Sequence, residues 1–460
     1  MVLTPASKQK RRPRKSAEGN REQVPGLGSR LAAAKLLSAI VDRRASMDGL
    51  LDPQNGNPAW RALSEQDRSL VRAILQAALR NLPIIDAFID LLVARPLPEG
   101  AVALRHTLRI AAAQILFLDI PAHAAVNIAV EMARGDPRNR RFVALVNALL
   151  RQMIRQKDEE LPRLQSRVIN APAWLGELIE SAYPEHASAI FEAHRHPPAI
   201  DLTVKSDSES WAARLGGRVT PTGSVRLGHV DGPITDLEGF ADGEWWVQDV
   251  AASIPARLFG EISGWRVADL CAAPGGKTAQ LALAGASVTA LDFSANRLKR
   301  LDENLKRLKL DAECVHADLF EWQPGEAFDA VLLDAPCSST GTIRRHPDIP
   351  WTKSPSDVAK LADLQERMLA RALTLVRPGG MVVFSNCSLA KEEGEDVVSA
   401  ILESHPKVDR RAVESALIPG LEDAISPEGD LRTTPDMLPD PDPAYAGLDG
   451  FFASILMRLS

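Results

Sequence analysis

Apolar side chains recur at helical spacing along the N-terminal third of the chain, between Leu31 and about Met153. Each of three stripes marks one buried helix face. The stripes run through Val71, Leu75, Ala78 and Leu82, through Leu104, Leu108, Ala111, Ile115 and Leu118, and through Phe142, Val146, Leu149 and Met153. Ser64 and Asp67 are spaced as in a helix start, and Pro96 and Pro98 interrupt the pattern. The pattern predicts a bundle of five or more helices.

The pattern changes twice further along the chain. More helix is expected from residue 158 to 196, and Pro197-Pro198 then marks a boundary. Between 199 and 250, strand-like pieces such as AIDLTV, SVRLG and EWWVQD alternate with glycine-rich turns. This alternation of short strands and turns predicts a small α+β connecting module.

From Trp265 onward, short apolar runs alternate with helical stretches such as 294–309. The runs are WRVADL, SVTALD, AECVHA, DAVLLD and MVVFSN, and a final FFASILMRL is expected at the sheet edge. This alternation predicts an α/β Rossmann-like domain with a parallel sheet, whose ligands bind beyond the carboxyl ends of the strands. The expected organisation is therefore a tail (1–29), a helical domain (30–156), a helical linker with the α+β module (157–250) and an α/β domain (251–460).

Composition narrows the class of protein. The 460 residues are 45% hydrophobic and 25% charged, which is ordinary for a globular chain. No apolar run of about 18 residues and no signal-like segment is found, so we predict a cytoplasmic protein without a membrane partner. Four cysteines in so long a chain predict free thiols in a reducing compartment.

Charge is unevenly distributed. The formal net charge of −6 argues against nucleic acid, but a local basic surface suffices for binding it. One basic run lies in the tail and a second cluster near the end of the helical domain: Lys8, Lys10, Arg11, Arg12, Arg14 and Lys15, and Arg134, Arg138, Arg140, Arg141 and Arg151. Each is either a solvated surface or a phosphate-seeking one, and the tail run is also compatible with a transit peptide.

The segment VADLCAAPGGKT, from Val267 to Thr278, places a glycine turn between a buried strand and a helix. Gly275 and Gly276 let a ligand approach the backbone, and the helix N-terminus offers free N–H groups. Two interpretations fit this segment, a phosphate-binding P-loop and the cofactor loop of an S-adenosylmethionine methyltransferase. Gly276-Lys277-Thr278 matches the end of a P-loop, but Cys271 stands where its first glycine belongs.

Acidic residues follow three successive predicted strands. Asp292 is placed to accept hydrogen bonds from ribose hydroxyls, and Asp318 is placed to meet an adenine. Asp334 ends the next strand. Carboxylates also serve as turn formers, so each alone is weak evidence. Three after a glycine loop favour the methyltransferase interpretation.

Two cysteines follow the fourth and fifth predicted strands. Cys337 lies in DAPCS and Cys387 in SNCS, so the two thiols are expected to be neighbours at one sheet edge. A lone cysteine there is usually a small buried hydrophobe. Two beside a cofactor loop suit covalent catalysis, because a thiolate adding to carbon 6 of a pyrimidine makes carbon 5 nucleophilic. Asp334 would hydrogen-bond the base edge, and the charge of Lys277 would favour the thiolate.

The N-terminal pattern resembles the NusB-like RNA-binding helical domain over residues 30–155. The matching stretches are LSEQDRSLVRAILQAALRNLPIIDAFI, RHTLRIAAAQILFLDIPAHAAVNIAVEMAR and RFVALVNALLRQM. Residues 245–400 resemble the RNA cytosine-5 methyltransferases of the Sun/Fmu family, on QDVAAS, CAAPGGKT, FDAVLLDAPCSSTGTIRRHPDIPW and SNCSLAKEEGED. This domain order resembles the bacterial subgroup that methylates small-subunit ribosomal RNA.

The resemblance implies a role for each matching residue. Cys387 would attack carbon 6 of the cytosine, and Cys337 would assist release of the methylated product. S-adenosylmethionine would be the cosubstrate, without a metal. Its pocket would be lined by Cys271, Ala272, Ala273, Pro274, Gly275, Gly276, Lys277, Asp292, Asp318 and Asp334. Ser385-Asn386 departs from the threonine that relatives commonly place before the nucleophile.

Two further groups have competing interpretations. Arg344, Arg345 and His346 follow the first cysteine motif and are either an exposed loop or a clamp on substrate phosphates. Trp245-Trp246 would either pack in a core or stack on bases.

Three functions are weighed on these residues. The favoured one is cytosine-5 methylation of RNA, with small-subunit ribosomal RNA as partner. DNA is not an expected partner, since DNA cytosine-5 enzymes take their nucleophile from the Pro-Cys site and need no Cys387. The alternatives are a non-catalytic RNA-binding ribosome-assembly factor that keeps the fold, and a P-loop NTPase.

Overall fold

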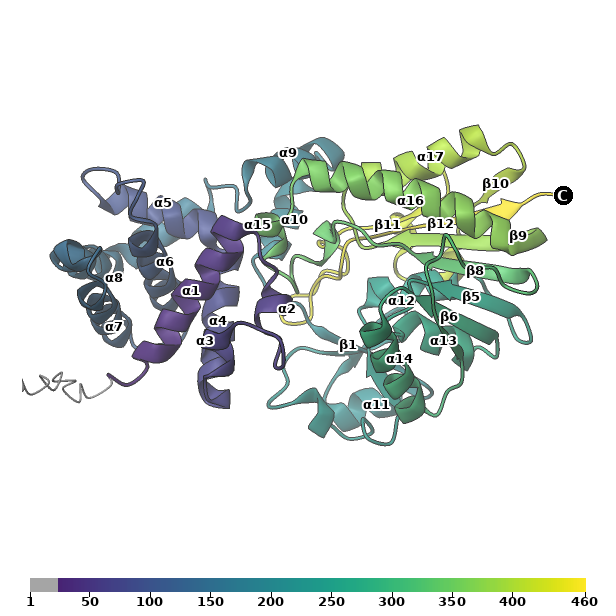
Figure 1. Cartoon of the computed structure of the whole chain (residues 1–460), viewed down its shortest axis with the longest axis horizontal. Helices are drawn as coiled ribbons and strands as arrows, with labels where there is room; N and C mark the ends of the chain where they lie inside the picture. The colour runs from purple at the N-terminus through teal and green to yellow at the C-terminus, as the bar shows by residue number, and fades with distance from the viewer. Residues whose placement is uncertain (1–23) are drawn as a thin grey trace, which may run out of the picture.

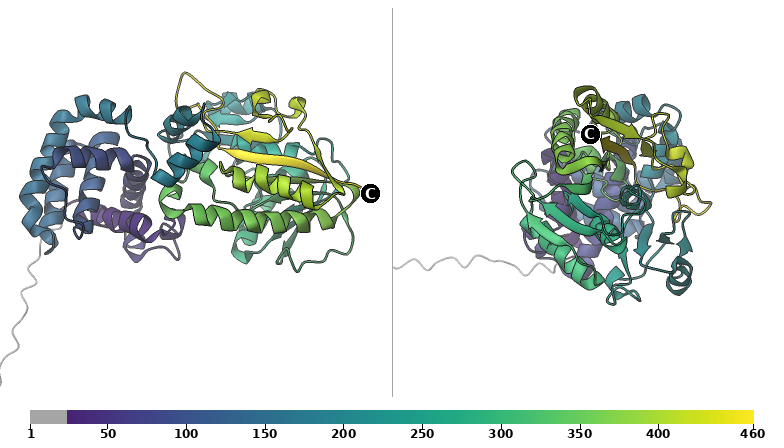
Figure 2. Two further views of the ribbon diagram at one scale, coloured as in Figure 1. Left: turned by 90° about the horizontal axis from the view of Figure 1, so that it is seen from above. Right: turned by 90° about the vertical axis from the view of Figure 1, so that its right-hand side faces the viewer.

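The computed structural model describes residues 24–460. The molecule is elongated, with a helical bundle at one end and a sheet-containing part at the other (Figures 1 and 2). The basic run at positions 8–15 lies outside the described residues, so its proposed role stays a prediction.

The N-terminal bundle confirms the predicted helical domain. Its helices are α1 (Leu27–Arg43), α2 (Met47–Leu50), α3 (Pro58–Arg61), α4 (Glu65–Arg80), α5 (Leu82–Leu92), α6 (Val102–Phe117), α7 (Ala122–Gly135) and α8 (Val143–Gln165). Ser64 caps α4 as predicted, its hydroxyl accepting a hydrogen bond from the Asp67 amide at 3.2 Å. Helix α8 continues to Gln165, so the predicted boundary at 156 falls inside it. No helix within residues 24–460 is both long and apolar enough to span a bilayer.

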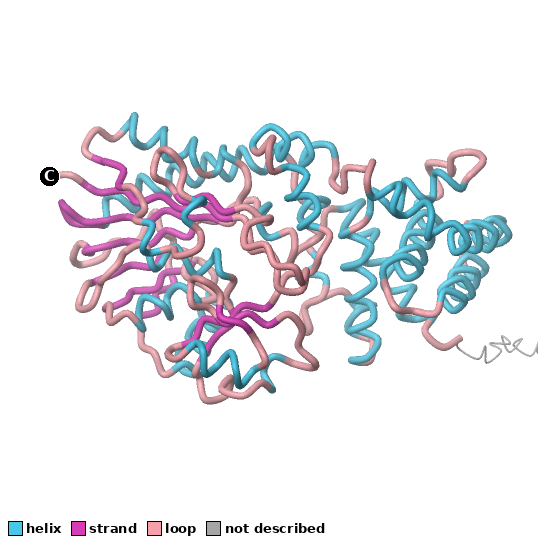
Figure 3. The backbone as a smooth tube through the Cα atoms, turned by 180° about the vertical axis from the view of Figure 1, so that it is seen from behind, coloured by secondary structure: helices cyan, strands magenta, loops and turns pink. Residues whose placement is uncertain are grey.

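A small sheet joins the bundle to the C-terminal domain. After α9 (Ala173–Ala182) and α10 (Ala187–His194) come β1 (Ile200–Val204), α11 (Ser208–Leu215), β2 (Arg218–Val219), β3 (Val225–Leu227) and β4 (Trp245–Val247). The strands pair antiparallel in the order β2-β3-β1-β4 and form a group separate from the larger sheet (Figure 3). Trp245 and Trp246 are both buried in packing contacts, which excludes them as free stacking platforms.

The C-terminal domain contains an eight-stranded sheet in the order β10-β12-β9-β8-β5-β6-β7, with β11 paired to β12. Its strands are β5 (Arg266–Leu270), β6 (Ser287–Asp292), β7 (Glu313–His316), β8 (Phe328–Asp334), β9 (Val376–Asn386), β10 (Val408–Arg411), β11 (Leu431–Thr433) and β12 (Phe451–Arg458). The five predicted strands β5 to β9 are parallel, so their carboxyl ends meet at one edge. This arrangement confirms the predicted Rossmann-like fold.

Helices cover both faces of this sheet because consecutive residues of its strands are apolar and point to opposite faces. Ala330 and Leu332 of β8 pack in one core, and Val331 and Leu333 pack in the other. The first face carries α12 (Val250–Arg257), α13 (Gly276–Leu283) and α14 (Ala295–Leu308), and the second carries α16 (Pro355–Leu375) and α17 (Glu395–Ser404).

The final strand is a correction to the sequence-based prediction. We expected FFASILMRL at the sheet edge, but β12 lies inside the sheet, antiparallel to both β9 and β10. The edge is β10, where Val408 and Asp409 pair with the end of β12. Residues 451–456 are all buried, since this strand is covered on both faces.

The loop after β8 leaves the sheet and reaches the N-terminal bundle through α15 (Ile349–Thr352). The Met47 amide donates to Asp348 Oδ2 at 2.9 Å, and the Trp351 indole donates to the Leu79 carbonyl at 3.2 Å. Trp351 also packs against the core of the bundle. The same loop begins at the first cysteine motif, so it physically links the bundle to the predicted site.

Candidate active site

The glycine loop between β5 and α13 is held in a conformation that only certain residues tolerate. Gly275 has φ +101°, and a Cβ there would lie 2.8 Å from Leu301 Cγ. The Ala272 amide donates to the Leu291 carbonyl at 3.0 Å, and the Ala273 amide donates to Asp292 Oδ2 at 3.1 Å. The loop is thereby fixed to the end of the neighbouring strand β6.

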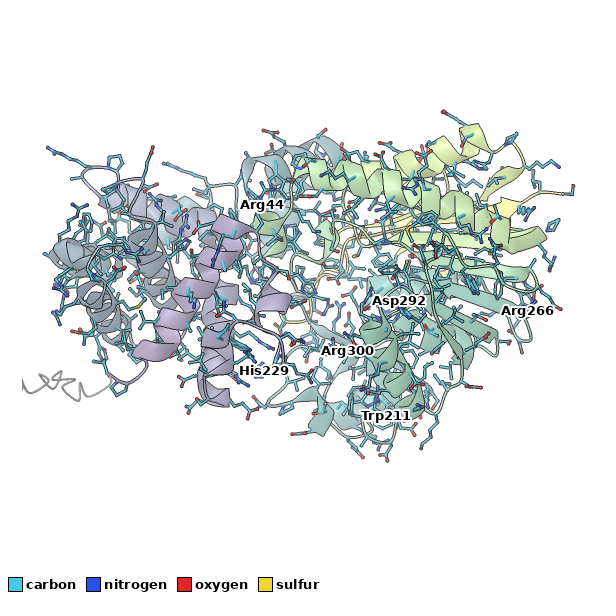
Figure 4. All side chains as sticks on the ribbon, viewed as in Figure 1. Arg44, Trp211, His229, Arg266, Asp292 and Arg300 are labelled. Carbon is cyan, nitrogen blue, oxygen red and sulfur yellow. The ribbon has the colours of Figure 1, made fainter. Side chains whose placement is uncertain are left out.

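A cavity of about 470 Å³ opens beside this loop at the carboxyl ends of the strands. Asp292 lies at its wall near the middle of the C-terminal domain (Figure 4), with Asp318 and the exposed ring of Phe293 beside it. The remaining lining is largely apolar and includes Leu291, Phe320, Leu364 and Met368. The buried carboxylate of Asp292 beside apolar walls suits a ligand that has both hydroxyl groups and a flat ring.

The two predicted cysteines meet in the same cavity. Cys337 Sγ lies 3.4 Å from Cys387 Sγ, and both side chains line the wall. The pKa of the Cys337 thiol is raised well above its ordinary value by its hydrogen bond with Cys387, by loss of solvent and by the charge of Glu393. Burial and nearby carboxylates raise the pKa of Cys271 to about 12. Cys271 therefore stays a protonated part of the loop.

Asp334, which lines the cavity, forms an ion pair with Lys277. Lys277 Nζ lies 2.8 Å from Asp334 Oδ2, and the Ser385 hydroxyl donates to Asp334 Oδ1 at 3.1 Å. The charge of Lys277 is therefore compensated by Asp334, which corrects the expectation that it acts directly on a thiolate. The pair instead fixes the carboxylate at the end of β8.

The three residues predicted as an exposed loop or phosphate clamp lie elsewhere. Arg344 is only 2% exposed and donates to the Ala446 carbonyl at 2.7 Å, so it fits neither interpretation. Arg345 pairs with Asp249 and with Asp449, the latter at 2.8 Å. His346 lies 3.5 Å from Asp48 in α2. All three engage other parts of the chain because the loop is packed between the domains.

Sequence reasoning missed several residues that shape the site. Arg297 donates to the Ala273 carbonyl and lies 3.5 Å from Asp292. Phe293 follows Asp292 directly at a strand end, and this position was a usable signal because ligands bind beyond the carboxyl ends of parallel strands. Glu393 is fully buried behind both cysteines. No sequence pattern indicated that Glu393 is buried, because an acidic run such as KEEGED is typical of a solvated helix start.

Comparison with known proteins places the chain in a family. Residues 262–457 match the family model described as 16S rRNA methyltransferase RsmB/F, and residues 28–155 match the NusB family. A curated relative from Serratia proteamaculans, ribosomal RNA small subunit methyltransferase B, is 36% identical over 419 residues, covering 87% of this chain and 95% of the relative. The chain belongs to the RsmB/F family of 16S rRNA methyltransferases.

Solved structures agree with the fold of this RsmB/F chain. The crystal structure of PH0851 covers 95% of this chain and 99% of its own, with TM-score 0.69 and 23% identity. The structure of NSun6 from Pyrococcus horikoshii with SFG covers 63% of this chain and 98% of its own, with TM-score 0.53 and 19% identity. These likenesses support the methyltransferase fold.

The site fits S-adenosylmethionine, the cosubstrate of the RsmB/F family. Asp292 is buried at the wall of a cavity large enough for a nucleoside, and Phe293 and Phe320 offer apolar surface beside it. Asp269 carries an unpartnered buried oxygen, Oδ1, and lines a second cavity together with residues 272–277 of the glycine loop. Within the described residues, no cluster of three or more His, Cys, Asp or Glu side chains suits a metal ion.

Proposed function

We propose that this RsmB/F methyltransferase methylates carbon 5 of a cytidine in small-subunit ribosomal RNA through a covalent adduct with Cys387. The observation that carries the proposal is the pair of thiols 3.4 Å apart at one wall of the cofactor cavity. A single-thiol or non-catalytic protein has no need of the second thiol. The proposed place of action is the cytoplasm, where ribosomal subunits are assembled.

The chemistry needs a nucleophile because carbon 5 of cytosine is by itself too weak a nucleophile to attack the methyl group, whereas carbon 6 accepts a thiolate. The Cys387 thiolate adds to carbon 6, and the electron pair of the 5,6 double bond becomes available at carbon 5. The cosubstrate supplies an electrophilic methyl group, and carbon 5 takes it. Loss of the carbon-5 proton to water then re-forms the double bond, and the carbon–sulfur bond breaks to return the Cys387 thiolate.

Cys337 fits the release step because it keeps its proton. Its raised pKa leaves an S–H group next to Cys387, and that group donates a hydrogen bond to the departing thiolate. Asp334 is fixed by Lys277 and Ser385 with its carboxylate at the cavity wall. A carboxylate accepts the amino hydrogens of cytosine, which uracil lacks.

The experiment uses purified chain, methyl-labelled S-adenosylmethionine and unmodified small-subunit ribosomal RNA, both free and in assembled particles. Wild type is expected to yield 5-methylcytidine in RNA digests, and Cys387→Ser is expected to yield none. Cys337→Ser is expected to accumulate RNA–protein adduct that survives denaturing gel electrophoresis, because release is slowed. The matched control is Cys314→Ser, a half-buried cysteine on β7 outside the cavity.

Two results would overturn the proposal. Formation of 5-methylcytidine by Cys387→Ser would show that another residue is the nucleophile. Failure of wild type on free RNA and on particles would favour the assembly-factor alternative.

A further inference from the structure

Glu393 is a fully buried carboxylate behind the cavity, at the end of the 3-10 turn Lys391–Glu393 before α17. Its Oε1 accepts from the Ser338 amide at 2.8 Å and from Gln365 Nε2 at 3.1 Å. Its Oε2 accepts from the hydroxyls of Ser338 and Ser388, each at 2.5 Å. Glu393 does not line the cavity, so it acts through its neighbours.

These neighbours flank the two cysteines in the chain. Ser338 follows Cys337, and Ser388 follows Cys387, so one carboxylate oxygen binds both cysteine loops. The Asn386 side chain, just before Cys387, donates to the Glu393 carbonyl at 2.6 Å. Gln365 also donates to the Pro336 carbonyl, just before Cys337, at 2.9 Å. Both flanks of each cysteine are therefore tied to Glu393 directly or through Gln365.

Burying the Glu393 carboxylate is energetically unfavourable, which argues that this residue has a function beyond packing. Burial raises the pKa of Glu393, because a charge is unfavourable where water is absent. No lysine, arginine or histidine among residues 24–460 pairs with it, so only neutral donors compensate its charge. An apolar side chain would fill the same space without that cost, but it would not join the two loops.

We propose that Glu393 is a positioning residue that sets the spacing of the Cys337 and Cys387 thiols for release of the methylated base. The inference rests on the proposed two-thiol mechanism. The shared oxygen Oε2 holds the two serines, whose hydroxyls lie 3.1 Å apart, and thereby keeps the adjacent thiols in contact. The negative charge of Glu393 also helps to keep Cys337 protonated.

The test variant is Glu393→Gln, which preserves side-chain size but removes the charge and one acceptor. We expect release of product from the adduct to slow by about tenfold to a hundredfold, since a displacement of about 1 Å can cost on the order of 100-fold. In single-turnover reactions, the ratio of adduct to 5-methylcytidine should rise. Affinity for S-adenosylhomocysteine should stay unchanged, because Glu393 lies outside the cavity.

A second readout is the pH dependence of Cys337 alkylation by iodoacetamide, followed by mass spectrometry. Removal of the nearby charge should shift its midpoint to lower pH. The matched control is Glu392→Gln, the exposed neighbour, which should behave as wild type in both assays.

The outcomes separate the inference from the proposed function. An unchanged adduct ratio and an unchanged alkylation midpoint, with lowered thermal stability alone, would overturn the positioning role. If no protein variant forms adduct or product, the proposed function fails. The alkylation midpoint still reports on Glu393 in that case, and an unshifted midpoint would overturn the inference as well.

Discussion

Asp292 shows how a single side chain serves both the fold and the cavity. One carboxylate oxygen accepts from the Ala273 amide at 3.1 Å and the other from the Ser294 amide at 2.9 Å. Arg297 lies 3.5 Å away and balances part of the charge. The carboxylate therefore fixes the glycine loop and the start of α14 while it faces the cosubstrate cavity.

Replacing Asp292 by alanine is expected to weaken binding of S-adenosylhomocysteine by at least tenfold. A hydrogen bond to a charged group contributes about 1.5–3 kcal/mol, and the loop also loses its anchor. Isothermal titration calorimetry measures the change. Asp302→Ala is the control, because Asp302 pairs with Lys306 on the exposed side of α14. Equal affinities of wild type and Asp292→Ala would show that the carboxylate does not contact the ligand.

At the residue scale, the sequence predicted side chains that follow strands and missed those that fold back between loops. Asp292, Asp334 and both cysteines were placed correctly, since parallel strands bring their carboxyl ends together. Arg344 was predicted in an exposed loop or a phosphate clamp and Glu393 was not predicted at all, because the burial of both depends on segments distant in sequence. A charged residue is usually exposed, so local pattern alone points the wrong way for a buried one.

At the element scale, most predictions from periodicity were confirmed. The helix expected at 294–309 is α14, and Ser294 caps it by accepting from the Arg297 amide at 3.4 Å. The predicted edge position of β12 was wrong, although its sequence indicated burial on both faces. FFASIL lacks the alternation of a half-exposed edge strand, and a continuous apolar run indicates burial on both faces.

The 3-10 turn Thr340–Thr342 makes the close approach that seats the second cysteine loop. The Gly341 amide donates to the Cys387 carbonyl at 2.9 Å, and the Gly450 amide donates to the Gly341 carbonyl at 2.9 Å. A Cβ on Gly341 would lie 1.9 Å from the Gly450 carbonyl oxygen. The 3-10 turn and the start of β12 must therefore move apart if residue 341 carries a side chain.

Gly341→Ala is expected to lower the rate of RNA methylation by at least tenfold and to destabilise the fold by ~1–3 kcal/mol, the usual cost of overpacking. Initial rates and thermal unfolding check the two effects. The control is Gly325→Ala, because a Cβ at Gly325 meets no atom within 4 Å. A fully active Gly341→Ala protein would show that the turn does not constrain Cys387.

At the scale of the whole molecule, the bundle and the C-terminal domain share a buried polar joint. Arg80 donates to the carbonyls of His194 and His196, each at 3.3 Å, and to that of Arg344 at 3.0 Å. His194 is buried close enough to both arginines to feel their charges, and its Nε2 has no hydrogen-bond partner among the described residues. Burial, with the charges of Arg344 and Arg80, lowers the pKa of His194 to about 3.

The low pKa of His194 makes this contact between the bundle and the C-terminal domain sensitive to acid. His194 stays neutral in the folded protein, whereas the unfolded chain takes up a proton near pH 6.5, so stability is lost as pH falls from 6.5 toward 3. Between pH 7.5 and 5.0, this residue accounts for ~2 kcal/mol of that loss. Urea unfolding of His194→Gln should show a correspondingly smaller dependence on pH. His229→Gln, at an exposed histidine, is the control, and equal slopes for His194→Gln and wild type would contradict the assignment.

The path of the chain through α15 limits how this enzyme can be recombined with its relatives. The segment that begins at Cys337 packs Trp351 onto the core of the bundle and accepts the Met47 amide on Asp348. A chimaera made by a single crossover near residue 156 or 196 would pair a foreign bundle with the native segment. The bundle can therefore be exchanged only as a discontinuous unit. A functional chimaera must take residues 343–352 from the same relative as the bundle that they contact.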